Sequence, residues 1–198
     1  RLVPVGRLDM YTSGALILTD DGDFVYKITH PKHEISKTYT VTLKGVVTKE
    51  EREKLEKGVD IGDFVTSKAK VKVLKIDDEQ NKTRLEITIH EGKNRQIRRM
   101  CEAINKKVLA LHRSKIGNIG VKDLKLGTWR YLTQKEVDEL LKSWYTKIYL
   151  LNKKINDAWC KKGGKSMVVD EEIKTKISPF AMREGEIKTF DGKDGYVS

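Results

Sequence analysis

An acidic loop beside an arginine, followed by a short apolar segment, constrains this chain more than any other feature. Val5-Gly6-Arg7-Leu8-Asp9 places a carboxylate two residues after an arginine, and Gly14 follows closely. The apolar residues 15–19 predict a strand, which the acidic turn at 20–23 ends. Glycines let a ligand approach the backbone, and a nearby cation keeps a carboxylate ionised. Most loop aspartates cap a turn or a helix, but this arrangement also suits an enzyme with one nucleophilic Asp.

The rest of the pattern predicts short strands interrupted by helices. Strands are expected at 15–19, 37–43, 66–76, 83–90 and 108–111. Helices are expected at 24–28, at 49–57, from an N-cap at Asn94 to Ile104, and from Thr133 to Trp144. Capping boxes at Thr48–Glu51 and Thr133–Glu136 fix the starts of two of them. Because the strands outnumber the helices and mostly follow one another as hairpins, we expect an α+β fold with a mainly antiparallel sheet.

The composition indicates which kinds of partner the chain can bind and in which compartment it works. The 198 residues suffice for one domain with a hydrophobic core, and the net charge of +11 favours a polyanion, either nucleic acid or an anionic membrane surface. No apolar run approaches the roughly 20 residues of a membrane span, and no signal peptide is visible. Cys101 and Cys160 lack metal-like spacing and are expected to be reduced thiols, as in the cytoplasm.

A basic segment strengthens the case for nucleic acid. Residues 93–115 contain eight lysines and arginines but one acidic residue, Glu102. A solvated helix face is the ordinary explanation for a run of charges. Here the cations have little acidic compensation, and the arginine fork suits phosphate contacts.

Three separated elements resemble one family in the same order. They are residues 6–22, Lys37-Thr38-Tyr39, and Glu91 to Met100, and the ending at 127–133 is also similar. The resemblance is to the pseudouridine synthases that act on bacterial ribosomal RNA, and it spans roughly residues 1–143. It implies a mixed but largely antiparallel sheet with helices on its outer faces and an active-site cleft across it.

The resemblance also implies catalytic roles. Asp9 would be the nucleophile or its equivalent, acting at ribose C1′ or on the uracil ring. Tyr39, which is otherwise an ordinary core tyrosine, would stack on the base and take the proton from C5. Arg98 would pair with Asp9 and keep it charged. No cofactor and no metal are implied.

Further residues would support the site or face RNA. The expected RNA-binding residues are Arg7, Lys37, Lys93, Arg95, Arg99 and Arg113. The expected supporting residues are Gly6, Leu8, Gly14 and Ile97, of which Ile97 would pack under the active site. Cationic contacts of this kind make RNA affinity fall as salt rises.

We expect a catalytic domain over residues 1–144 and an extension of unknown role over 145–198. Members of the family usually begin with a small S4-like RNA-binding domain and a further strand. The chain starts just before the acidic loop, so we expect both to be absent. Residues 148–153 faintly resemble the missing strand, and one hypothesis is that they fill its place at the sheet edge.

The expected function is isomerisation of a specific uridine in ribosomal RNA by a cytoplasmic monomer without membrane attachment. The ending at 127–130 looks slightly more like enzymes that act on the large subunit, and small-subunit RNA or tRNA stay open as alternatives. A second alternative is a non-catalytic RNA-binding remnant of the fold. A third is a nucleoside hydrolase, which normally needs two carboxylates, and Glu91 is the available partner for Asp9.

Overall fold

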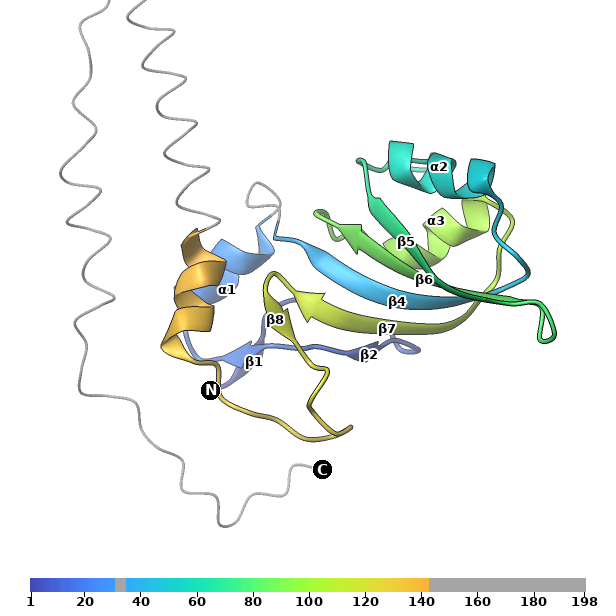
Figure 1. Cartoon of the computed structure of the whole chain (residues 1–198). Coiled ribbons are helices and arrows are strands. Elements are labelled where there is room, and N and C mark those ends of the chain that lie inside the picture. Colours follow the sequence, from blue (N-terminus) through green and yellow to red (C-terminus); the bar gives the residue numbers. More distant parts are fainter. Residues whose placement is uncertain (31–34, 143–198) are drawn as a thin grey trace, which may run out of the picture. The chain divides into compact units, whose positions relative to one another are not determined.

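The computed structural model describes residues 1–30 and 35–142, and a six-stranded mixed sheet dominates them (Figure 1). Its strand order is β2-β7-β4-β6-β5, and β8 pairs with β7. The strands are β2 (Ser13–Gly14), β4 (Lys37–Lys44), β5 (Lys70–Asp77), β6 (Lys82–Ile89), β7 (Val108–Ile116) and β8 (Ile119–Gly120). Every pairing in this sheet is antiparallel except β2 with β7, which is parallel. The α+β class with a mainly antiparallel sheet is therefore confirmed.

Helices cover the sheet in two places. The helices α2 (Lys49–Lys57) and α3 (Gln96–Ala103) lie over the same face of the sheet (Figure 1). The helix α1 (Gly22–Thr29) and a helix at 134–142 pack together near the small antiparallel pair of β1 (Val3–Pro4) and β3 (Leu18–Thr19).

Local sequence signals account for several boundaries. At α2 the Thr48 hydroxyl accepts from the Glu51 amide and the Glu51 carboxylate accepts from the Thr48 amide, at 3.2 and 2.9 Å. Gly58 then ends the helix at φ 103°, a backbone angle that favours glycine. The same reciprocal pair joins Thr133 and Glu136. Both predicted capping boxes are confirmed.

Three predicted elements differ from the structure. The strand expected at 108–111 continues to Ile116, because β7 pairs with both β4 and β2 although its sequence becomes polar. The N-cap of α3 is Arg95, in a left-handed conformation, instead of Asn94. Of the strand expected at 15–19, only Leu18–Thr19 forms a regular strand, β3.

Two hydrophobic clusters hold the described part together. The larger lies between the sheet and helices α2 and α3, and contains the predicted stripe of α3: Ile97, Met100, Cys101 and Ile104. Burial raises the pKa of the Cys101 thiol to about 12, which agrees with the predicted core position. The smaller cluster joins α1, helix 134–142 and the end of β7 through Phe24, Ile28, Ile116, Ile119, Leu140 and Leu141.

Several predictions concern residues outside the described ranges 1–30 and 35–142. Trp144, Cys160, the boundary near 145 and the hypothesis about 148–153 all lie outside the residues that the structure describes. Among the helices of residues 1–30 and 35–142, none combines the length and the apolar character that a bilayer crossing needs.

The larger cluster should carry most of the stability of the sheet. Leu85 is fully buried at its centre, so Leu85→Ala should lower the free energy of unfolding by about 2–5 kcal/mol. Leu126→Ala is the matched control, because Leu126 is 91% exposed, and it should change stability by less than about 0.5 kcal/mol. Urea denaturation of both variants checks this. Equal losses would mean that Leu85 does not belong to the stabilising core.

Candidate active site

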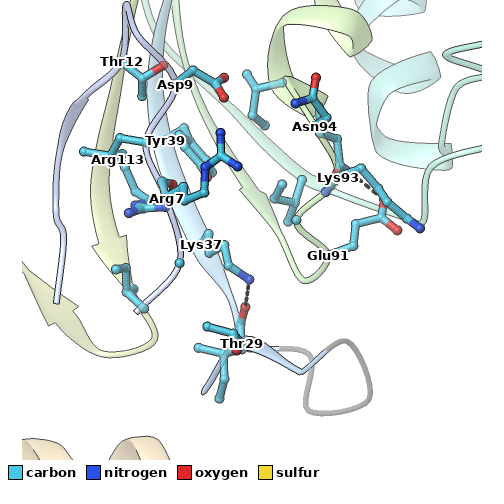
Figure 2. Close-up of a pocket in the computed structure, with 18 of the residues that line it drawn as sticks. Arg7, Asp9, Thr12, Thr29, Lys37, Tyr39, Glu91, Lys93, Asn94 and Arg113 are labelled. Carbon is cyan, nitrogen blue, oxygen red and sulfur yellow. Dashed lines mark hydrogen bonds between the residues drawn. The ribbon is translucent and has the colours of Figure 1, made fainter. Parts of the chain in front are cut away.

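A cavity of about 450 Å³ opens between the acidic loop, strand β4 and the turn before α3 (Figure 2). Its volume lies in the roughly 300–1,000 Å³ range of small-ligand pockets. Residues of both hydrophobic clusters line it: Ile28, Ile35 and Ile116 from the smaller cluster, and Ile89, Ile97 and Leu111 from the larger. The cavity therefore follows the seam between the two clusters.

The backbone of β7 holds the acidic loop in place. β2 pairs in parallel with β7, and the Ala15 amide donates to the Arg113 carbonyl at 2.7 Å. Gly14 adopts φ 115°, and a Cβ built there would lie 2.2 Å from the Arg113 carbonyl oxygen. Only glycine fits this approach, which gives the predicted supporting residue Gly14 a physical reason.

The side chain of Arg113 also anchors the loop. Its Nε donates to the Ala15 carbonyl at 2.8 Å and its Nη1 donates to the Arg7 carbonyl at 3.1 Å. The side chain is 4% exposed and lines the cavity, and its buried Nη2 has no hydrogen-bond partner. Arg113, expected at the RNA surface, thus lies beneath the loop, with one free donor.

Asp9 lines the cavity and is partly buried. A turn fixes it, because the Thr12 amide donates to the Asp9 carbonyl at 2.9 Å. Within the described residues no ion pair to the Asp9 carboxylate is formed, either by Arg7 or by Arg98. Arg98 instead donates from Nη2 to the Tyr11 carbonyl at 2.5 Å, and its buried Nε has no partner. Arg98 therefore contacts the turn that carries Asp9 and does not line the cavity.

The pairing of β4 with β7 is irregular at the tyrosine of the site. The register of β4 against β7 shifts between Thr38 and Tyr39. Interruptions of a ladder such as β-bulges redirect side chains and are frequent next to active sites. Tyr39 packs against the larger cluster and also lines the cavity, so it contacts both the core and the site.

Lys37 lines the cavity two residues before Tyr39. Its Nζ donates to the Ile35 carbonyl at 3.2 Å. Burial lowers the pKa of Lys37, and the charge of Arg113 on the adjacent strand lowers it further. Lys37 and Arg113 thus form a positive part of the cavity wall.

The turn before α3 is held by side-chain hydrogen bonds, some of them to the distant Ser67. The Glu91 carboxylate accepts from the Ser67 amide and hydroxyl and from Gln96 Nε2, at 2.9, 3.1 and 2.6 Å. Gln96 Oε1 accepts from the Lys93 amide at 3.0 Å, and Gln96 is 3% exposed. These bonds enclose Arg95, whose φ of 47° is unfavourable for a residue with a Cβ. The turn is therefore shaped by tertiary contacts.

Two of the expected RNA-facing residues of this segment contact the loop before β5. Arg99 donates to the Asp63 carboxylate and to the Ile61 carbonyl, and this bond lowers the pKa of Asp63. The Lys93 ammonium lies 5.1 Å from the centre of the Phe64 ring. Arg99 does not line the cavity, whereas Lys93 and Arg95 do.

The structure brings most of the predicted site residues together. Those that line the cavity are Gly6, Arg7, Leu8, Asp9, Lys37, Tyr39, Lys93, Arg95, Ile97 and Arg113, while Gly14, Arg98 and Arg99 lie outside its lining. Sequence reasoning missed Thr12 and Gln96, which also line it. The Thr12 hydroxyl is buried without a partner, and its place three residues after Asp9 was the available signal.

No group of three or more His, Cys, Asp or Glu side chains among residues 1–30 and 35–142 is arranged to hold a metal ion. His33, one of two loop histidines, lies outside the described residues.

Comparison with known proteins places these motifs in context. The model of a family described as RNA pseudouridylate synthase matches residues 1–103. Ribosomal large subunit pseudouridine synthase B of Bacillus subtilis (strain 168) is 45% identical over 140 residues, which cover 71% of this chain and 57% of that protein. Ribosomal small subunit pseudouridine synthase A of Vibrio vulnificus (strain CMCP6) is 40% identical over 140 residues, covering 69% of this chain and 58% of that protein.

A solved structure agrees with the sequence matches. A crystal structure of a pseudouridylate synthase matches with a TM-score of 0.64 at 39% identity, covering 70% of this chain and 59% of the other. The chain thus spans somewhat more than half the length of the relatives it matches.

The close contact at Gly14 leads to a stability prediction. Gly14→Ala should lower the free energy of unfolding by about 1–3 kcal/mol or more, because the new Cβ overlaps the Arg113 backbone at a positive φ. Gly22→Ala is the matched control: nothing lies within 4 Å of a Cβ there, and Gly22 begins α1. Thermal or urea unfolding compares the two. A Gly14 variant as stable as the Gly22 variant would contradict the packing of β2 on β7.

Proposed function

The chain belongs to the RNA pseudouridylate synthase family, and from this premise we propose that it converts a uridine of ribosomal RNA to pseudouridine. The observation that carries the proposal is that Asp9 and Tyr39, which match the family's motifs, line one cavity of nucleotide size. In the reaction the bond from N1 to ribose C1′ breaks, a bond from C5 to C1′ forms, and the proton of C5 is lost while N1 gains one. No atoms are gained or lost overall.

Asp9 would be the residue that attacks. It lies at the end of a short turn that the Thr12 amide closes, and the loop behind it is fixed to β7 by backbone bonds and by Arg113. A fixed nucleophile loses little freedom when the substrate binds, which lowers the barrier to reaction.

Tyr39 would hold the base. Its flat ring can stack on uracil, and its hydroxyl supplies a polar group at the cavity wall. The target uridine must first leave its stack, which costs a few kcal/mol and is cheapest in loops and bulges of RNA. Stacking on Tyr39 inside the cavity would offset part of that cost.

Arg98 would act on Asp9 through the loop. We assign it a positioning role, because it donates to the Tyr11 carbonyl within the Asp9 turn. The resemblance leads one to expect a direct pair with Asp9. The guanidinium instead contacts the backbone of the turn that carries this carboxylate.

Ribosomal RNA is the substrate we propose, and large-subunit RNA is the first to test. The relatives include both a large-subunit and a small-subunit enzyme, at 45% and 40% identity. The cationic residues Arg7, Lys93 and Arg95 at the cavity supply the charge that an RNA backbone requires.

The two competing functions have less support. A nucleoside hydrolase would need Glu91 as a free second carboxylate, but both of its oxygens already accept hydrogen bonds from Ser67 or Gln96. A non-catalytic RNA-binding remnant would not need the rigid Asp9 turn. The match covers 57% and 58% of the two relatives, so the assay is made on this chain by itself.

Asp9→Asn should abolish tritium release from ribosomal RNA labelled at uridine C5, with a loss of at least about 10³-fold, because an amide cannot act as the nucleophile. Asp20→Asn is the matched control, since Asp20 is exposed and does not line the cavity. It should release tritium like the parent.

The outcomes separate the candidate functions. Tritium release by the parent and Asp20→Asn but not by Asp9→Asn supports the synthase. Salt-sensitive RNA binding without release by any of the three would favour the binding remnant. Release of free uracil from nucleosides would favour the hydrolase.

A further inference from the structure

The cavity wall holds two cations that lack an acidic partner. Arg113 on β7 and Lys37 on β4 both line the cavity, and these strands are hydrogen-bonded neighbours. Among residues 1–30 and 35–142, no carboxylate forms an ion pair with either of them. Asp9 and Lys37 point to separate parts of the cavity (Figure 2). Glu91, the other carboxylate of the lining, is bonded to Ser67 and Gln96.

Unpaired cations in such positions are costly. Charged side chains are almost never fully buried unless they are paired, because the interior solvates them poorly. Arg113 is 4% exposed, and its Nη2 is a buried donor without a hydrogen-bond partner. The lowered pKa of Lys37 has the same origin, namely its burial and the nearby charge of Arg113. An anion bound between them would remove this cost.

The chemistry of the substrate identifies the anion. Uracil and ribose are uncharged, so the phosphate group is the anion that a uridine nucleotide brings to the cavity. The arginine fork matches phosphate oxygens, and the lysine ammonium adds a point charge.

We propose that Arg113 Nη2 and Lys37 Nζ bind a phosphate group adjoining the target uridine inside the cavity. This inference rests on the proposed function for the identity of the nucleotide. Arg113 then has two tasks: its Nε and Nη1 hold the Asp9 loop, and its free Nη2 holds the substrate. The same guanidinium would therefore fix the distance between the reacting ribose and the Asp9 loop.

Calorimetric titration of the full chain with uridine, uridine 3′-monophosphate, uridine 5′-monophosphate and inorganic phosphate tests this. One of the monophosphates should bind the parent about tenfold tighter than uridine, the gain expected of one charge-assisted contact. Lys37→Met should remove that preference, so that the monophosphate and uridine bind this variant with equal affinity. Lys44→Met is the matched control, since Lys44 is an exposed lysine of the same strand, and it should keep the preference.

A second variant protects the test against misfolding. Arg113→Lys keeps a charge but loses the fork that holds the loop, so its thermal unfolding is measured first. If it folds, it should also lose the preference for the monophosphate. Equal affinity for uridine and both monophosphates, or an equal loss in Lys44→Met, would overturn the inference.

Two further comparisons complete the test. Inorganic phosphate that binds as tightly as the better monophosphate would show a free-phosphate site and overturn the assignment to substrate. Tritium release by the parent without a monophosphate preference would remove this inference and leave the proposed function intact. A preference for the monophosphate without tritium release from ribosomal RNA would contradict the proposed function and leave the phosphate-binding site intact.

Discussion

The candidate site depends on the attachment of an irregular loop to strand β7. The loop that carries Asp9 has little regular structure of its own, since β2 contains only Ser13 and Gly14. Arg113 supplies what the loop lacks: its carbonyl accepts from Ala15, its side chain donates to two loop carbonyls, and its backbone packs against Gly14. Burying a charged side chain costs free energy, because the interior solvates it poorly. In return, the buried Arg113 fixes the Asp9 loop, although loops are generally the more mobile segments of a protein.

A second support comes from the opposite side of the cavity. Glu91 and Gln96 tie the turn before α3 to Ser67, and Arg99 ties the start of α3 to the loop at Asp63. From α3, which follows this turn, Arg98 donates to the Tyr11 carbonyl. The cavity is thus bounded by two irregular segments that the sheet holds by specific polar contacts, while the hydrophobic clusters beneath supply stability. This division suits an active site, which needs polar groups fixed in position on a rigid scaffold.

The sequence predicted the parts of this arrangement that depend on neighbouring residues. The capping box at Thr48 and the buried stripe from Ile97 to Ile104 are local patterns, and both are present. The length of β7 was underestimated, because the polar residues 112–115, which include the buried Arg113, interrupt the apolar pattern that marks a strand. Asn94 was expected as the N-cap of α3, but the cap is Arg95, because bonds from the distant Ser67 help to shape this turn.

For the site too, the residues could be predicted from the sequence but their long-range contacts could not. Family resemblance indicated Asp9, Lys37 and Tyr39, which the structure brings to one cavity, but it could not indicate that Arg99 is bonded to Asp63, 36 residues away. The most direct test of the account is a crystal structure of the full chain with a ribosomal RNA fragment that carries 5-fluorouridine at the modified position. The account predicts the base stacked on Tyr39 with ribose C1′ beside the Asp9 carboxylate. A base bound outside this cavity, or a ribose beside Glu91, would contradict it.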